Sequence, residues 1–117
     1  MPSQPFRTYL ETFRRRAGFS RPEIGFLLGA MDGKSVSNHE RLARYPKLHT
    51  ALAYAVIFNA PVDHLYEGLA REIRSEMKAR ARGLAKRLSK GRQTNLVKKK
   101  IAILNRLVAD EGVDLTT

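Results

Sequence analysis

One segment of the chain, residues 34–44 (KSVSNHERLAR), combines short hydroxyl and amide side chains with basic ones. If this segment is helical, only four of its side chains are suited to burial: Val36, His39, Leu42 and Ala43. Such a helix contributes little to a hydrophobic core, so its remaining face is free to enter a groove. The major groove of B-DNA has about the width of one α-helix. The segment is therefore the first candidate for a nucleic-acid contact.

Catalytic and metal-binding patterns are missing from the sequence. The chain has no cysteine, and its three histidines, His39, His49 and His64, do not have the spacing of metal ligands. No nucleophile elbow, phosphate-binding glycine loop or histidine-paired nucleophile occurs. Two pairs of carboxylates four residues apart are interpreted as charge partners of nearby arginines: Asp63 with Glu67, and Glu72 with Glu76. We therefore expect no enzymatic activity, no metal and no other cofactor.

The composition points to a polyanionic partner. The 117 residues include 22 Lys and Arg against 11 Asp and Glu, which gives a formal charge of +11 and a pI of about 10.6. This excess is larger than solubility requires and is typical of proteins that bind nucleic acid or an anionic membrane surface. A hydrophobic fraction of 43% is enough for a packed core.

The sequence also predicts where the protein is found. The longest stretch without a charged side chain, residues 48–62, is shorter than the ~20 apolar residues of a membrane span. The first residues, MPSQPFR, lack the apolar core of a signal peptide. The absence of cysteine excludes a disulfide scaffold. We expect a small cytoplasmic protein that does not enter the membrane.

The charge is divided unevenly along the chain. Residues 1–69 hold 9 basic and 6 acidic side chains, a net of +3, whereas residues 70–117 hold 13 and 5, a net of +8. Between Met77 and Ala109 there are 11 Lys or Arg and no carboxylate. We therefore predict two regions, a domain over residues 1–69 and a basic helical extension over residues 70–117.

Apolar residues at spacings of three and four predict helices in the first region. The first helix begins at Pro5 and ends at Gly18, and its apolar face comprises Phe6, Tyr9, Leu10, Phe13 and Ala17. A second helix, residues 21–28, begins at a capping box formed by Ser20 and Glu23. Gly25 and Gly29 can supply the close helix crossing and the turn before the polar helix, which we predict over residues 34–42.

Further helices are expected after Pro46. One ends at Asn59 and has Leu48, Leu52, Ala55 and Val56 on its apolar face. Another starts at Pro61 and continues as a long helix with an apolar stripe of Leu65, Leu69, Ile73, Met77, Ala81, Leu84 and Leu88. A break at residues 89–92 precedes a last helix over residues 95–109. No segment alternates as a strand does, so we predict an all-α fold.

Five short motifs follow one another in the first region. They are Phe19-Ser20-Arg21, Glu23-Ile24-Gly25, Leu28-Gly29, Val36-Ser37 with Glu40 and Arg41 after it, and FNAPVDHLY at residues 58–66. In order and spacing they resemble the lambda-repressor/Cro-like (XRE) helix-turn-helix family over about residues 6–69. The resemblance implies a five-helix lambda-repressor-like domain that binds double-stranded DNA.

The resemblance also implies roles for individual residues of a recognition helix in the major groove. It assigns base edges to Lys34, Ser35 and Asn38, a base or a phosphate to Ser37, and phosphates to Arg21, Arg41 and Arg44. Lys can donate to guanine O6 and N7, and Asn can pair with adenine N6 and N7. The segment from Gly29 to Val36 is one residue longer than the family pattern, which leaves the register of the helix open by one position. Arg21 stands where the family commonly has Gln.

Residues 70–117 lie outside the resemblance, and three interpretations of them remain open. The helices can pack on their own domain, pair with a second subunit in a homodimer, or hold DNA phosphates. Bulky aromatic residues are absent from residues 67–117, which argues against membrane-surface binding. The sequence thus favours a dimeric transcriptional regulator of bacterial or phage type. An antitoxin-like or accessory protein with a protein partner on the C-terminal helices, and a non-specific nucleoid or RNA-binding protein, are the alternatives.

Overall fold

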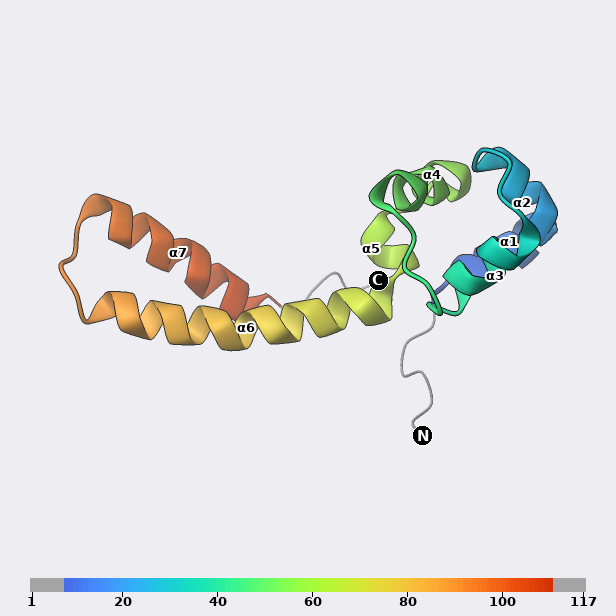
Figure 1. Cartoon of the computed structure of the whole chain (residues 1–117). Helices are drawn as coiled ribbons and strands as arrows, with labels where there is room; N and C mark the ends of the chain where they lie inside the picture. Colours follow the sequence, from blue (N-terminus) through green and yellow to red (C-terminus); the bar gives the residue numbers. More distant parts are fainter. Residues whose placement is uncertain (1–7, 111–117) are drawn as a thin grey trace, which may run out of the picture. The chain divides into compact units, whose positions relative to one another are not determined.

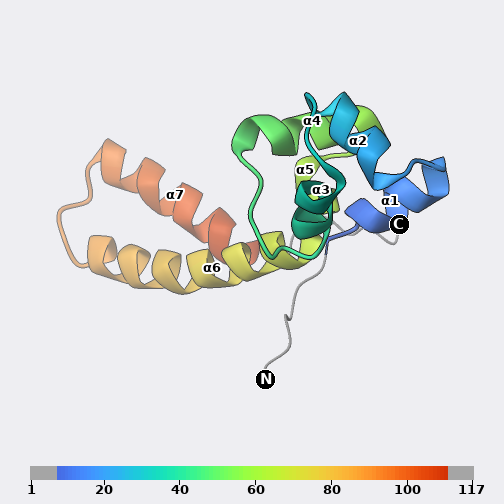
Figure 2. The same cartoon turned by 45° about the vertical axis from the view of Figure 1, so that its right-hand side comes forward.

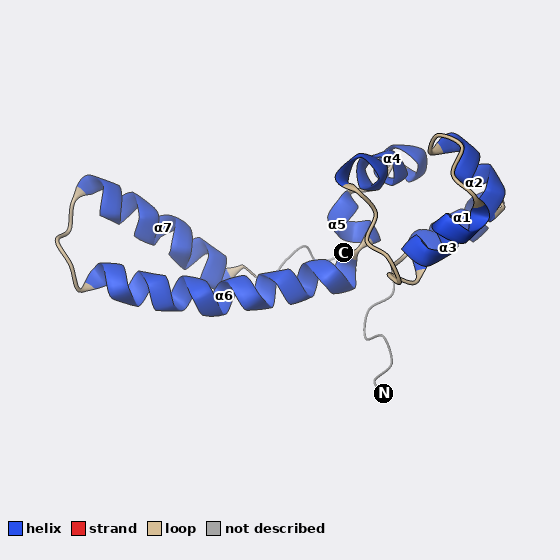
Figure 3. Ribbon diagram, viewed as in Figure 1, coloured by secondary structure: helices blue, strands red, loops and turns tan. Residues whose placement is uncertain are grey.

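The computed structural model describes residues 8–110, which form seven helices and no strand (Figures 1 and 3). The predicted all-α class is confirmed. The helices are α1 (Leu10–Ala17), α2 (Arg21–Leu27), α3 (Gly33–Glu40), α4 (Leu48–Phe58), α5 (Val62–Leu65), α6 (Glu67–Ser89) and α7 (Asn95–Ala109). The chain divides into two compact units, unit 1 (residues 1–69) and unit 2 (residues 70–117). The first helix begins at Leu10, with Tyr9 as its N-cap, so the predicted start at Pro5 is wrong; Pro5 and Phe6 themselves lie outside the described residues.

The ends of the first helices follow from local sequence. Gly18 ends α1 with a φ of 85°, a left-handed conformation that glycine adopts without steric cost. The capping box of α2 is present: the Ser20 amide donates to Glu23 Oε1 at 2.8 Å, and the Glu23 amide donates to Ser20 Oγ at 3.2 Å. These hydrogen bonds lower the pKa of Glu23. Asn59 ends α4 with a φ of 49°, as predicted.

Helices α1–α5 of unit 1 lie close together (Figure 2), and the buried apolar side chains among them form a continuous hydrophobic core. Its buried members are Leu10, Ile24, Val36, Leu42, Tyr54, Leu65 and Tyr66. Full burial of one such side chain contributes about 1.5–3 kcal/mol. The expected face of α1 is only partly right, because Leu10 is buried but Tyr9 is 43% exposed and Ala17 is also exposed. The core therefore fixes the five helices of unit 1 relative to one another.

The predicted face of α4 is wrong except at Ala55, which is partly buried and packs against the core. Leu48, Leu52 and Val56 are 74%, 50% and 81% exposed, whereas Thr50 and Tyr54 are buried. Apolar residues surround this helix on all sides, so their spacing does not distinguish the core face from the solvent face. The Tyr54 hydroxyl, which forms a hydrogen bond with a buried residue of α3, selects the face that packs.

The long helix expected from Pro61 is divided in two. Pro61 precedes α5, as predicted, but Tyr66 leaves the helical conformation with φ −117° and ψ 44° before α6 begins. Tyr66 is buried, and the bend is the point at which its ring enters the core. Its hydroxyl has no hydrogen-bond partner among the described residues, and burial raises the pKa of Tyr66.

Unit 2 contains α6 and α7, which converge toward the C-terminal end of α7 and separate toward the connecting loop (Figures 1 and 2). Thr94 begins α7 by accepting a hydrogen bond from the Val97 amide at 3.1 Å. Ala81 is the only buried residue of unit 2 within residues 70–110. The expected stripe is therefore only partly right, since three of its members are exposed by 45%, 40% and 39%: Ile73, Met77 and Leu84.

Candidate nucleic-acid interface

Helix α3 buries one face and presents the other to solvent. Val36 is completely buried and Glu40 is 2% exposed, whereas Lys34 and Arg41 are exposed and Asn38 is half-buried. Residues 34, 38 and 41 are separated by four and three positions, so they follow one another along one side of the helix. We call Lys34, Asn38 and Arg41 the outer row of α3.

The turn before α3 requires small residues. The Met31 amide donates to the Gly25 carbonyl at 2.9 Å, and a Cβ atom at residue 25 would overlap the Met31 carbonyl. Gly29 has a φ of 113°, which an L side chain rarely adopts. The predicted role of Gly29 in the turn is thus confirmed. Gly25 does allow a close approach, but the approach is to the carbonyl of Met31 in the turn and not to a crossing helix.

The two ends of α3 differ from the prediction. Asp32 caps the helix by accepting a hydrogen bond from the Ser35 amide at 2.8 Å, which, with Lys34 nearby, lowers the pKa of Asp32. The predicted range of 34–42 is wrong at its C-terminal end, because the helix stops at Glu40. Leu42 then has a φ of 56° and places its side chain in the core. Asp before a helical segment was the missed signal for the cap.

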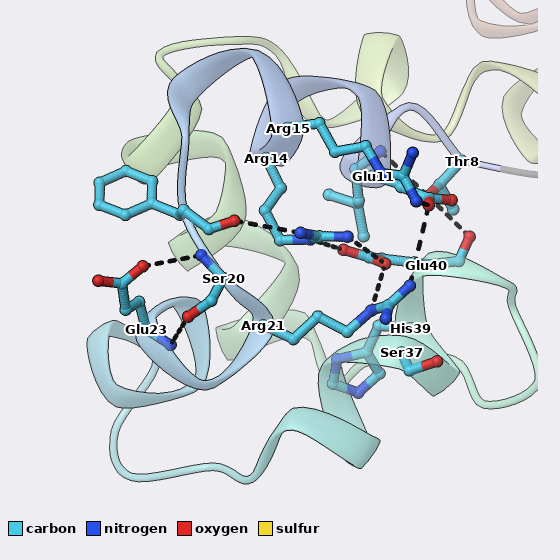
Figure 4. A network of polar contacts seen from close by, with 12 residues as sticks. Thr8, Glu11, Arg14, Arg15, Ser20, Arg21, Glu23, Ser37, His39 and Glu40 are labelled. Carbon is cyan, nitrogen blue, oxygen red and sulfur yellow. Dashed lines mark hydrogen bonds and ion pairs between the residues drawn. The ribbon is translucent and has the colours of Figure 1, made fainter.

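A buried group of charges attaches α3 to the two preceding helices. Glu40 Oε2 accepts from Arg14 Nε at 2.6 Å, and Glu40 Oε1 accepts from Arg21 Nε at 3.0 Å (Figure 4). Arg21 also lies 3.8 Å from Glu11. We call Glu11, Arg14, Arg21 and Glu40 the Glu40 cluster. Its members come from α1, α2 and α3, so the cluster fixes how α3 is rotated against the other two helices.

Backbone atoms complete this arrangement. The Thr8 hydroxyl donates to the Glu40 carbonyl at 3.0 Å, and Arg14 Nη1 donates to the Phe19 carbonyl at 3.1 Å. Arg14 is 7% exposed, so loss of the Glu40 carboxylate would leave a buried guanidinium without its counter-charge. Removing one partner of such a pair costs about 3–5 kcal/mol. The sequence did not reveal this cluster, because periodicity assigns charged side chains to the surface.

Arg21, for which a phosphate contact was predicted, holds a structural position. Its guanidinium faces the carboxylates of Glu11 and Glu40, and its side chain is 39% exposed. An arginine held in this way has little freedom to reorient.

The outer row is ordered by its own hydrogen bonds. Arg41 Nη2 donates to Asn38 Oδ1 at 2.8 Å, and Arg41 Nε lies 3.5 Å from Ser37 Oγ. An amide oxygen has two lone pairs, so Asn38 Oδ1 can accept a second hydrogen bond while its NH₂ group donates. This is the pattern that recognition of adenine requires.

Ser35 and Arg44 lie apart from the outer row. Both line a hollow of about 480 Å³ between α3, the segment that follows it and the start of α4. His39 lines the same hollow and lies within 2.9 Å of the Tyr54 hydroxyl through Nδ1. Burial lowers the pKa of His39 and so disfavours its charged form. The seven predicted contact residues therefore occupy three places: the Glu40 cluster, the outer row with Ser37 beside it, and this hollow.

The cations of unit 2 are arranged differently. Lys98, Lys99 and Lys100 are all exposed near the start of α7, and Arg80, Arg82, Lys86 and Arg87 are exposed along α6. Elsewhere in this unit, Arg74 Nε lies 3.9 Å from Asp110 Oδ2. These side chains supply positive charge without the fixed positions that unit 1 gives to its cations.

Within residues 8–110, no group of three His, Asp or Glu side chains is placed to hold a metal ion. No helix in that range has the length and apolar character needed to cross a membrane. Comparison of the chain with protein-family models, with curated proteins and with solved structures finds no match. The interpretation of α3 therefore depends on the chain's own residues.

Proposed function

We propose that the chain is a sequence-specific double-stranded DNA-binding protein with α3 as its recognition helix. In this proposal α1–α5 form a lambda-repressor-like helix-turn-helix domain of the XRE type. The protein would act as a cytoplasmic transcriptional regulator of bacterial or phage type, without a catalytic site or a cofactor. The observation that carries the proposal is the division of α3 into a polar outer row and a face held by Glu40 and Val36.

The chemistry of the outer row suits base edges. Lys34 can donate to guanine O6 and N7, and Asn38 can accept from adenine N6 and donate to N7. Arg41 continues the row toward the DNA backbone, and Ser37 lies beside it. A recognition helix discriminates between bases only if its side chains are presented in one orientation, and the Glu40 cluster supplies that constraint.

The remaining contacts are to phosphates. Arg21 and Arg44 would meet the DNA backbone. Ser35 keeps the base-edge role that the resemblance implies and lines the hollow together with Arg44. The exposed cations of unit 2 would add affinity that does not depend on sequence. Each phosphate that a cation neutralises steepens the dependence of log K on log salt by about 0.9.

We also propose that the protein is a homodimer that pairs through unit 2. The support is the near absence of buried residues there: Ala81 alone is buried among residues 70–110, while Ile73 and Met77 are 45% and 40% exposed. A two-helix unit of this kind is stabilised by covering its apolar side chains. The exposed row of α4 that contains Leu52 is the competing surface.

Sedimentation or light scattering of two full-length variants distinguishes these surfaces. Met77→Ser should weaken dimerisation by tenfold or more, because a buried Met side chain contributes about 1.5–3 kcal/mol. Leu52→Ser is the matched control in unit 1 and should leave the dimer unchanged. If only Leu52→Ser dissociates the dimer, the dimer interface lies on α4 and not on unit 2. A monomeric wild type would refute the homodimer.

The second candidate function is sequence-independent binding of nucleic acid by unit 2. The three consecutive exposed lysines at residues 98–100 favour this function. A protein partner on the exposed apolar side chains of α6 and α7, as in an antitoxin-like or accessory protein, is the third.

Competition binding separates the first two functions. Duplexes selected by the protein from a random pool should bind it at least about 10³-fold more tightly than random duplexes do. Equal affinity for all duplexes, lost at moderate salt, would refute sequence-specific binding and leave the non-specific function.

A further inference from the structure

The hollow beside α3 has a floor of buried polar side chains. His39 and Thr50 are 8% and 7% exposed, and both line it, as does the half-buried Ser35. Its volume of about 480 Å³ falls within the ~300–1,000 Å³ of small-molecule sites. Small-molecule sites generally combine an apolar wall with a few convergent polar groups.

Two polar atoms of this floor have no hydrogen-bond partner among residues 8–110. His39 bonds through Nδ1 to Tyr54, and neither His39 Nε2 nor the Thr50 hydroxyl has a partner among residues 8–110. In that range the one fully covered side-chain polar atom without a partner is Tyr66 Oη. Solvent therefore reaches the unpartnered atoms of His39 and Thr50, and the hollow that both residues line is the opening.

The rim of the hollow is cationic. Arg44, Lys47 and His49 are exposed there, and no carboxylate is among the lining residues. When the Tyr54 hydroxyl donates to His39 Nδ1, the imidazole proton lies on Nε2, which then donates into the hollow. Donors on the floor and positive charges on the rim together select an anion.

One part of the lining is an apolar wall. Leu28, Met31 and Tyr45 form it, and Tyr45 is 68% exposed, so its ring is accessible to a ligand. An anion alone would leave this wall uncovered, whereas an anion that carries an organic group would cover it. A ring or a short hydrocarbon group attached to the anion fits both sides.

We propose that this hollow binds a small phosphate monoester. The phosphoryl group contacts the Ser35 and Thr50 hydroxyls, His39 Nε2 and the guanidinium of Arg44, and the organic part packs on Tyr45 and Met31. Phosphate is favoured because its three terminal oxygens can accept from several donors at once. A phosphate within DNA can meet the exposed rim, but the duplex is too wide to bring it to side chains that are nine-tenths buried. The site does not depend on the proposed DNA binding.

Nuclear magnetic resonance titration of the full-length protein with phenyl phosphate tests the site, with inorganic phosphate and phenol as comparison probes. Phenyl phosphate should shift the His39 ring, Thr50 and Met31 signals saturably and bind more tightly than either comparison probe. Thr50→Val keeps the side-chain shape and removes one hydrogen bond to a charged group, so affinity should fall about tenfold. Arg44→Ala should also weaken binding, whereas Arg16→Ala, which removes an exposed cation of α1, should change it less than about twofold.

Each opposing result identifies a specific error. Equal losses in Arg44→Ala and Arg16→Ala, or shifts spread over α6 and α7, would show non-specific attraction of anions and overturn the site. Equal affinity for inorganic phosphate and phenyl phosphate would refute the claim that the ligand is a phosphate ester, because the organic group would add nothing to binding. Random duplex DNA could instead shift the same His39 and Thr50 signals, and Thr50→Val could weaken DNA binding as much as it weakens phenyl phosphate binding. In that case the hollow binds a DNA phosphate, and the proposal of a free small ligand is refuted. The phenyl phosphate arm contains no DNA, so failure of the DNA-binding proposal leaves its result intact.

Discussion

Residues 8–69 and residues 70–110 are both helical, yet they use their side chains in different ways. The first region buries Leu10, Ile24 and Val36 almost completely and connects three helices through Glu40, whereas the second buries only Ala81. A fixed side-chain direction needs packing on the opposite face of the helix. The two regions are therefore suited to different tasks.

Charge follows the same division. Unit 2 carries a net +8 and unit 1 a net +3, so the larger charge lies where the side chains are least constrained. Unconstrained cations increase affinity for a polyanion without selecting a sequence. The modestly charged unit 1 holds the outer row in one orientation, and specificity is therefore attributed to it.

The largest expected effect comes from removing the carboxylate that holds α3. Glu40→Ala should lower the free energy of unfolding of unit 1 by about 3–5 kcal/mol, because Arg14 stays buried without a counter-charge. All four tyrosines lie in unit 1, at positions 9, 45, 54 and 66, so urea unfolding followed by tyrosine fluorescence reports on this unit. Glu76→Ala, at an exposed position of α6, is the control and should change stability by less than about 0.5 kcal/mol. Equal effects of the two substitutions would contradict the comparison.

Two glycines give the next contrast. Gly25→Ala should destabilise unit 1 by about 1–3 kcal/mol, because the added Cβ overlaps the Met31 carbonyl. Gly83 has no atoms of other residues close to where a Cβ would lie, so Gly83→Ala should stabilise α6 by about 0.5–1 kcal/mol. Thermal unfolding followed by circular dichroism measures the stability of both variants. A neutral Gly25→Ala would show that the turn at Met31 can accommodate a Cβ atom at position 25.

The parts of the fold that sequence predicts are those decided by neighbouring residues. The capping box at Ser20, the left-handed ends at Gly18 and Asn59 and the range of α7 depend on interactions within a few positions. A small residue at position 25 was predictable, but the structure places it against the carbonyl of Met31 in the turn and not at a helix crossing.

The parts that sequence missed are decided by residues far apart in the chain. Glu40 is buried because Arg14, 26 positions earlier, neutralises it. The apolar face of α4 was assigned to the wrong side, since Tyr54 packs by a contact with His39 that periodicity does not contain. Residues of the outer row could be named from the sequence, but the separation of Ser35 and Arg44 into a hollow required the packed structure.

Two buried tyrosines should respond in opposite ways to loss of their hydroxyl groups. Tyr54→Phe leaves His39 Nδ1 without a partner and should cost about 1 kcal/mol. Tyr66→Phe removes a buried hydroxyl that has no partner in residues 8–110 and should be neutral or stabilising by up to about 1 kcal/mol. Urea unfolding followed by circular dichroism measures the two free energies. Destabilisation by Tyr66→Phe would show that its hydroxyl is bonded in solution.

The smallest expected effect is a dependence of stability on pH. Burial lowers the pKa of His39 in the folded chain, so below its ordinary value of 6.5 the unfolded chain binds the proton first. The contribution of His39 to stability is therefore present above pH 6.5 and is lost as the pH falls toward the lowered value. Melting temperatures between about pH 7.5 and 5.5 should fall less in His39→Gln than in the wild type. An identical fall of the melting temperature in both proteins would show that His39 does not cause the pH dependence.

The central claim is that α3 reads sequence while unit 2 supplies affinity, and one binding measurement tests it most directly. The affinity ratio between a selected duplex and a random duplex is measured over a range of salt concentrations for the wild type, Asn38→Ala and Lys98→Ala. Asn38→Ala should reduce the preference for the selected duplex, expressed as a free-energy difference, by about 1–3 kcal/mol, with little change in the salt slope. Lys98→Ala should weaken both duplexes alike and reduce the slope by about one unit. A ratio that falls in Lys98→Ala and is unchanged in Asn38→Ala would contradict the claim.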